Sequence, residues 1–190
     1  MKSNKIILTL IIGGLLIIII SCKQNYTPKP YGYFRIDLPK KEYKKHESEM
    51  PFSFEVPNYA FVINDSINKE WSNIDFPLNN ARIYMTYKNV ENNFSILSEE
   101  AREFVYKHTV KADAIKESYY GNEDEKVYGI LYDIKGNAAS SVQFFLTDST
   151  KHFVRASLYF NNVPNKDSLA PVIEFIREDI VHLIETFAWE

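Results

Sequence analysis

Apolar and polar residues alternate over seven short stretches after residue 50, the pattern of strands that bury one face. The predicted strands span residues 52–56, 59–63, 82–88, 114–120, 127–134, 142–147 and 152–160. Because only Pro57-Asn58 separates the first two, we expect them to form a hairpin. Residues Trp71, Phe76 and Pro77 fall in a predicted loop. The short connections favour antiparallel pairing, including a hairpin around Gly136-Asn137.

Two stretches repeat their apolar residues at helical spacing. Ser98 is a plausible N-cap for the first helix, whose apolar stripe is Leu97, Ala101, Phe104 and Val105. The second helix is expected over residues 168–187, with Pro171 in its first turn, where a missing amide costs little. Its apolar residues are Leu169, Val172, Ile173, Ile176, Ile180, Leu183, Ile184 and Phe187. These residues lie on one face, so we expect the helix to pack along its full length on a sheet.

The order of elements is three strands, a helix, four strands and a helix, which predicts an α+β fold. We expect an antiparallel sheet of about six to seven strands with two packing helices, an αβα sandwich. This order, with its Phe-Ser-Phe opening at residue 52 and its long closing helix, resembles the Mog1 and PsbP group.

The first 21 residues have the three regions of a bacterial signal peptide. Lys2 and Lys5 precede an uncharged run of 15 residues at 6–20, and Ile19-Ile20-Ser21-Cys22 resembles a lipobox. A helix of that length spans roughly 22 Å, less than the ~30 Å hydrocarbon core of a membrane. We therefore expect cleavage before Cys22 and attachment of lipid to its sulfur, with a periplasm-facing position on a membrane.

Residues 22–50 are expected to form a lipid-anchored tether and extended segment ahead of a globular domain at 51–190. Within them, the charged stretch 40–47 predicts a solvated loop or short helix, or else a docking patch for an anionic partner. The stretch 31–39 mixes aromatic residues with arginine, as protein interfaces do, although it could equally cover an edge of the core. Its candidate partner-binding residues are Tyr31, Tyr33, Phe34 and Arg35.

Removing the leader leaves 169 residues (190 − 21) and changes the formal charge from −3 to −5, because two lysines leave with it. A mildly acidic chain of one domain's length argues against nucleic-acid binding. The 13 Tyr, 13 Phe and 2 Trp suit a sheet-rich domain with large rings to bury or to offer to partners.

Signatures of catalysis are missing from the sequence, which carries no GxSxG elbow, phosphate loop or nucleotide fingerprint. Glu178, His182 and Glu185 share a helix face and could in principle ligate a metal, but a solvated surface explains them better. Asp133 and Arg155 are charges within apolar strands, expected at a strand edge or paired with a neighbour. We expect no enzymatic activity, metal or cofactor; a carboxylate pair formed by the fold stays open.

Four long stretches resemble the gliding-motility lipoprotein GldD family of the Bacteroidetes. They lie at residues 28–39, 104–109, 127–145 and 164–171, and thus span nearly the whole chain after the leader. The resemblance implies a cell-envelope lipoprotein needed for gliding, which is coupled to type IX secretion. It implies no enzymatic activity, and it suggests the integral membrane protein GldE as a partner. The expected role is assembly or stabilisation of this machinery; a periplasmic lipoprotein that binds a small apolar or glycan ligand is the alternative.

Overall fold

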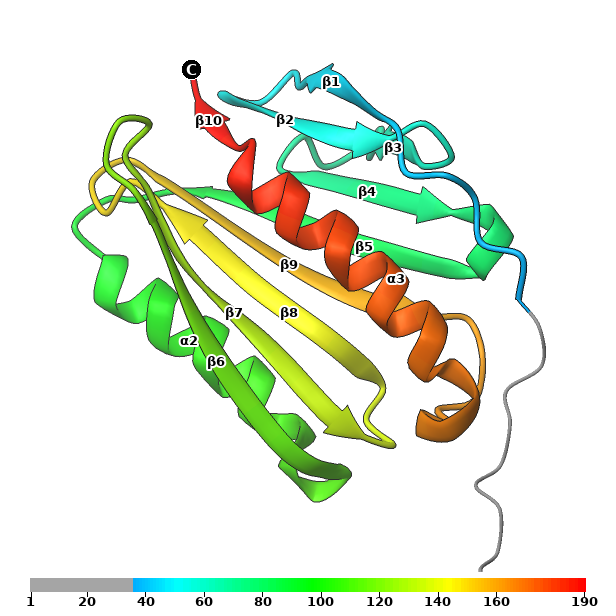
Figure 1. Ribbon diagram of the computed structural model, residues 1–190. Coiled ribbons are helices and arrows are strands. Elements are labelled where there is room, and N and C mark those ends of the chain that lie inside the picture. The colour runs from blue at the N-terminus through cyan, green and yellow to red at the C-terminus, as the bar shows by residue number, and fades with distance from the viewer. Residues whose placement is uncertain (1–35) are drawn as a thin grey trace, which may run out of the picture. The chain divides into compact units, whose positions relative to one another are not determined.

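The structure is a computed structural model that describes residues 36–190. Its seven-stranded antiparallel sheet has the order β3-β4-β5-β9-β8-β7-β6, and a smaller sheet has the order β1-β2-β10 (Figure 1). The strands of the large sheet are β3 (Phe61–Asn64), β4 (Trp71–Phe76), β5 (Ala81–Asn89), β6 (Ala112–Asn122), β7 (Val127–Gly136), β8 (Ser140–Thr147) and β9 (His152–Phe160). Those of the small sheet are β1 (Tyr43–Glu47), β2 (Phe52–Pro57) and β10 (Ala188–Trp189).

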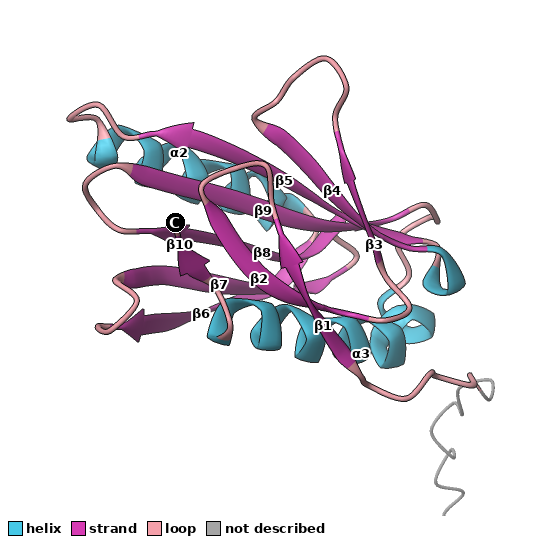
Figure 2. Cartoon of the chain, turned by 90° about the horizontal axis from the view of Figure 1, so that it is seen from above, coloured by secondary structure: helices cyan, strands magenta, loops and turns pink. Residues whose placement is uncertain are grey.

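Two helices pack on opposite faces of the large sheet, as Figure 2 shows. Helix α2 (Phe94–Tyr106) buries Leu97, Ala101 and Val105 in a cluster with residues of β7, β8 and β9. Helix α3 (Lys166–Glu185) lies on the other face, where the small sheet shares its core. Short 3-10 turns follow β4 (Pro77–Asn79) and α2 (Lys107–Val110). The predicted α+β sandwich with two packing helices is therefore confirmed. No helix among residues 36–190 is long and apolar enough to cross a membrane.

Three predictions about the strands are wrong. Strand β2 does not form a hairpin with β3, because it pairs with β1 and β10 in the other sheet. The charged stretch predicted as a loop or short helix contains β1, an edge strand in which Tyr43 and His46 are partly buried and Lys44, Lys45 and Glu47 are exposed. The predicted loop around Trp71 is β4, which pairs with both β3 and β5.

The helix boundaries also differ from those predicted. Helix α2 begins at Phe94, one turn before the predicted cap Ser98, and Phe104 is 43% exposed instead of lying on the buried stripe. Helix α3 begins at Lys166, because the Asn165 side chain accepts a hydrogen bond from the Ser168 amide. Pro171 is thus the sixth residue of the helix and lies in its second turn. Phe187 follows the helix end but is still buried, 1% exposed.

Candidate interaction surface

Helix α2 covers only part of its face of the large sheet, so the outer side of β3, β4, β5 and part of β9 is left open. The register places Phe61, Asp75, Arg82 and Tyr159 in one row across these strands. A second row holds Ile63, Asn73, Tyr84 and Ser157, and a third Trp71, Thr86 and Arg155. We call these eleven residues the open face.

Four large apolar side chains of the open face are about half exposed. Phe61 is 57% exposed, Ile63 47%, Trp71 49% and Tyr84 48%. Isolated apolar residues are normal on protein surfaces, but the register brings these four onto the same side of three neighbouring strands. Grouped exposed apolar residues with polar side chains among them are typical of protein-binding surfaces.

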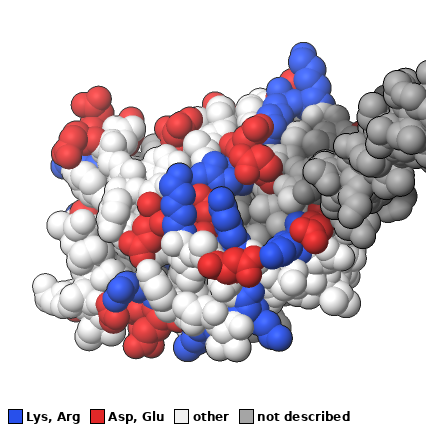
Figure 3. Space-filling view, turned by 60° about the horizontal axis from the view of Figure 1, so that its bottom comes forward, with Lys and Arg blue, Asp and Glu red and all other residues white. Residues whose placement is uncertain are grey.

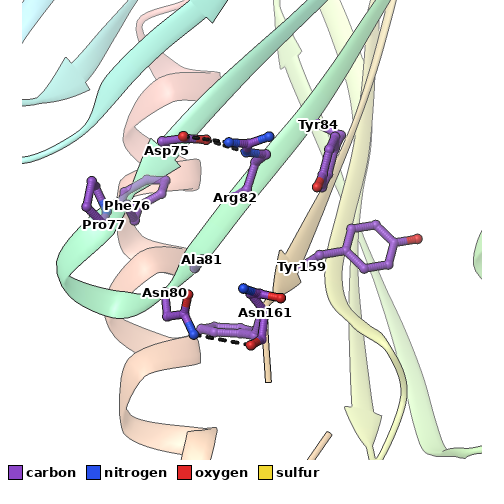
Figure 4. Close-up of a pocket in the computed structure, with 10 residues that line it drawn as sticks. Asp75, Phe76, Pro77, Asn80, Ala81, Arg82, Tyr84, Tyr159 and Asn161 are labelled. Atoms are coloured by element: carbon purple, nitrogen blue, oxygen red, sulfur yellow. Dashed lines mark hydrogen bonds and ion pairs between the residues drawn. The ribbon is translucent and has the colours of Figure 1, made fainter. Parts of the chain in front are cut away.

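A hollow of about 710 Å³ lies at one end of the open face, where the 3-10 turn Pro77–Asn79 joins β4 to β5 (Figure 4). Arg82 donates two hydrogen bonds to Asp75 on the neighbouring strand, and the bond with Asp75 raises the pKa of the Arg82 guanidinium. The same guanidinium lies 5.6 Å from the ring centre of Tyr84, which meets Tyr159 edge-on at 5.7 Å. Asn80 and Asn161 line the other side. This edge hollow combines aromatic rings with fixed polar groups.

A second depression of about 430 Å³ lies between α2 and the strands, and we call it the Arg155 groove. Trp71, Phe104 and Phe153 supply its aromatic walls. The guanidinium of half-buried Arg155 lies 4.0 Å from the ring centre of Phe104, and burial lowers the pKa of Arg155. Arg155 was predicted at a strand edge or paired with a neighbour. It lies on β9, an interior strand of the large sheet, and it forms no ion pair with residues 36–190, so its close neighbour is the Phe104 ring.

A buried carboxylate on α3 holds the small sheet in place. Asp179 is 2% exposed and accepts hydrogen bonds from Lys41 Nζ at 2.7 Å, Tyr43 Oη at 2.9 Å and Tyr59 Oη at 2.6 Å. Burial, reinforced by the bonds to Asp179, raises the pKa of both phenols far above neutral pH. Because all three donors are engaged and the tyrosines stay protonated, the cluster suits a structural clamp better than acid–base chemistry.

The helix face proposed for a metal is partly covered by the small sheet. His182 stacks on Tyr43 with ring centres 3.6 Å apart, and its Nε2 lies 2.7 Å from a Glu55 carboxylate oxygen. Glu178 lies 3.4 Å from Lys41, while Glu185 is exposed. Residues 36–190 contain no group of three or more metal-ligating side chains placed to hold an ion.

The other predicted site residues divide into two groups. Asp133 pairs with Arg177 of α3 through bonds of 2.5 and 2.9 Å, as expected for a strand charge with a neighbour. Cys22, Tyr31, Tyr33, Phe34 and Arg35 lie outside the described residues, so their predicted roles stay predictions.

Sequence reasoning missed the open face because it missed β4. The sequence does contain a pattern that would have identified it. Trp71 is an odd number of residues from Ile74 and Phe76, which are each 1% exposed, so in a strand it points to the opposite face. Once the stretch is assigned to a strand, the parity alone places Trp71 on the far side of the sheet from these core residues.

Charge on the surface is mixed rather than segregated. On the face seen in Figure 3, basic and acidic side chains are interspersed.

Comparison with known proteins bears on both fold and family. The family model described as gliding motility lipoprotein GldD matches residues 23–189. The chain belongs to the GldD family. As a GldD-family lipoprotein it is associated with gliding motility and anchored in the cell envelope.

Among solved structures, this GldD-family chain is similar to the cyanobacterial PsbP of Synechocystis sp. PCC 6803. The TM-score is 0.50 at 7% identity, over 85% of this chain and 100% of that one. This likeness confirms the PsbP-like fold and carries nothing about activity. No curated protein sequence matches the chain.

Proposed function

We propose that this GldD-family lipoprotein is a non-enzymatic component that assembles or stabilises the gliding and type IX secretion apparatus through protein contacts. The open face is the observation that supports this role most strongly. It presents Phe61, Ile63, Trp71 and Tyr84 side by side on β3, β4 and β5, each about half exposed. Apolar anchors surrounded by polar groups are what protein-binding surfaces use.

Attachment at the membrane is the second part of the proposal. Lipid on Cys22 holds the domain at the envelope, facing the periplasm, after the leader at residues 1–21 is removed. The family match, which begins at residue 23, supports this cleavage position. A surface-bound protein needs only modest contact affinity, because anchoring raises its local concentration next to membrane partners. An integral membrane protein such as GldE is the partner class that this arrangement favours.

Site-specific photo-cross-linking in gliding cells tests the proposal. A photoreactive phenylalanine analogue at Tyr84 of the full-length chain is expected to capture an envelope protein of the gliding machinery. The same analogue at Val163, 86% exposed and outside the open face, serves as the matched control. Equal capture at both positions, or capture at neither, would contradict docking through the open face.

A ligand-binding role is the second candidate, and the edge hollow favours it. Tyr84 and Tyr159 offer ring surfaces next to the Asp75–Arg82 pair, the mixture with which proteins hold sugars. Titration of the purified lipoprotein with N-acetylglucosamine oligomers tests this role. Saturable binding that is lost in Tyr159→Ala supports a glycan ligand, and absence of binding removes this candidate.

A further inference from the structure

We propose that the Arg155 groove binds a carboxylate flanked by apolar side chains, supplied by an extended segment of the protein that docks on the open face. The inference deepens the proposed function and rests on it. The groove would then be the position at which the docking surface distinguishes an acidic segment from a neutral one.

The first support is a cation in a partly desolvated place that forms no ion pair within residues 36–190. Arg155 is half-buried at the edge of the open face next to α2, where β9 pairs with β5 and β8. By contrast, Arg82 and Arg177 each make two hydrogen bonds with an aspartate. A guanidinium that has lost part of its hydration is stabilised strongly by an anion that enters the site.

The second support is the concentration of positive charge at Phe104. Lys107 Nζ lies 4.5 Å from the centre of this ring and Arg155 4.0 Å from it. Among residues 36–190, neither cation forms an ion pair. Arg155 is also attracted by the carboxylate of Glu100, but Glu100 forms its ion pair with Lys88. Both cations therefore keep hydrogen-bond donors for an incoming group.

The charges around the groove favour a monoanion. Its lining carries the cations Lys88, Lys107 and Arg155, and the acids Glu100 and Glu103. Glu100 already engages Lys88 at 3.5 Å. The lining thus has an excess of one positive charge (3 − 2), which one carboxylate matches. A phosphate group, with a charge near −2, would meet repulsion from the two glutamates.

The residues that line the groove favour a protein segment over a small free acid as the ligand. Trp71 and Phe104 stand beside Arg155, and Trp71 is continuous with the exposed apolar residues of the open face. A chain that lies across β4 and β5 can therefore place apolar side chains on Trp71 and one acidic side chain on Arg155. Aromatic and arginine side chains at the centre of an interface commonly provide most of its affinity.

Binding of a model acid provides the test. The full-length, lipid-anchored protein in nanodiscs carries Trp189→Phe, so that Trp71 is its single tryptophan. The probe is 3-(4-nitrophenyl)propanoate, whose nitro group quenches tryptophan fluorescence, and the comparison compound is its primary amide. We expect saturable quenching by the acid with a Kd roughly 10-fold or more below that of the amide, the size expected for a charge-assisted hydrogen bond.

Two variants assign the effect to Arg155. Arg155→Met should abolish the preference for acid over amide, and Arg155→Lys should restore part of it. Arg102→Met removes the same charge from the exposed side of α2 and should leave the preference unchanged. Equal binding of acid and amide, or a preference that survives Arg155→Met, would overturn the inference. The acid and the amide are first compared on the protein that retains Arg155. Their difference in Kd therefore does not depend on how the Arg155 variants fold.

Further measurements distinguish a failure of this inference from a failure of the proposed function. Tighter binding of 3-phenylpropyl phosphate than of the acid would overturn the assignment in favour of a lipid headgroup. In cells, a photoreactive analogue at Thr86, beside Arg155 in the register, should cross-link less in Arg155→Met than in the parent chain. If cross-linking at Tyr84 persists while the groove shows no acid preference, the assembly role stands and this inference fails.

Discussion

Single residues show most clearly what the sequence conceals. Asp179 lies on the buried, apolar side of the amphipathic helix α3. The residues next to it in the sequence do not explain why an acid is buried there. Its partners Lys41, Tyr43 and Tyr59 come from more than 100 positions earlier. The reason for a buried acid is therefore a tertiary arrangement, and only the structure supplies it. The same holds for Arg155, which forms no ion pair within residues 36–190 and contacts the Phe104 ring instead.

Asp148 provides a residue-scale prediction about pH. Burial alone would raise its pKa, but the amides of His152, Lys151 and Thr150 donate to its carboxylate and lower the pKa to about 2. The pKa of Asp148 in the folded state is thus below the ordinary aspartate value of 3.8. The resulting stability is present above about pH 4 and is lost as the pH falls towards 2.

We expect Asp148→Asn to lower the free energy of unfolding by about 1 kcal/mol at pH 7, with the difference shrinking as the pH falls towards 2. Urea unfolding of the lipoprotein in detergent between pH 2 and 7 measures it. Asp124→Asn, at an exposed carboxylate in the turn between β6 and β7, is the control and should show no such trend. A penalty that stays constant over the whole range would show that the charge of Asp148 is not responsible.

At the scale of elements, strong periodicity was a reliable guide and weak periodicity was not. The strands at residues 82–88, 127–134, 142–147 and 152–160 and both helices were predicted close to their observed positions. Strand β1 was missed because an edge strand next to solvent can carry three charges in five residues. The hairpin at Pro57 was wrong because a short connection can also pass between two sheets. Local sequence does not encode that choice.

Glycine at position 129 sets how closely β7 and β8 approach. A Cβ atom there would overlap the carbonyl oxygen of Phe145, and it would lie 2.7 Å from a methyl group of Leu146. We expect Gly129→Ala to lower the free energy of unfolding by about 1–3 kcal/mol, because backbone atoms must move apart. Gly121→Ala is the matched control, since its Cβ meets only the Tyr128 ring at 3.8 Å. Thermal unfolding that shifts equally in both variants would contradict this account.

At the scale of the whole molecule, the two faces of the large sheet are covered to different extents. The face under α3 and the small sheet is filled by the main core, whereas the α2 face is only partly covered and leaves the open face exposed. The sequence predicted the layers correctly. It did not show which face remains uncovered, because that depends on how far a helix of 13 residues reaches across seven strands.

Anchoring and folding should be separable in this arrangement. We expect Cys22→Ser to yield unlipidated precursor and abolish gliding, while the domain at residues 36–190 stays folded. Acyl labelling measures the lipid, and protease resistance of the domain measures its fold. Normal acyl labelling of Cys22→Ser would place the lipid on another residue.

The pairing of β2 with β10 also constrains the order in which the domain can form. Phe52 stacks on Phe187 at 5.1 Å and meets Trp189 edge-on, so an early strand completes its packing only with residues near the other end of the chain. Until residues 187–189 are in place, Phe52 and Phe54 lack these ring contacts. Deletion of only the last four residues would remove Phe187 and Trp189. The small sheet would then lack its third strand, and the apolar side chains of β2 would lack these two packing partners.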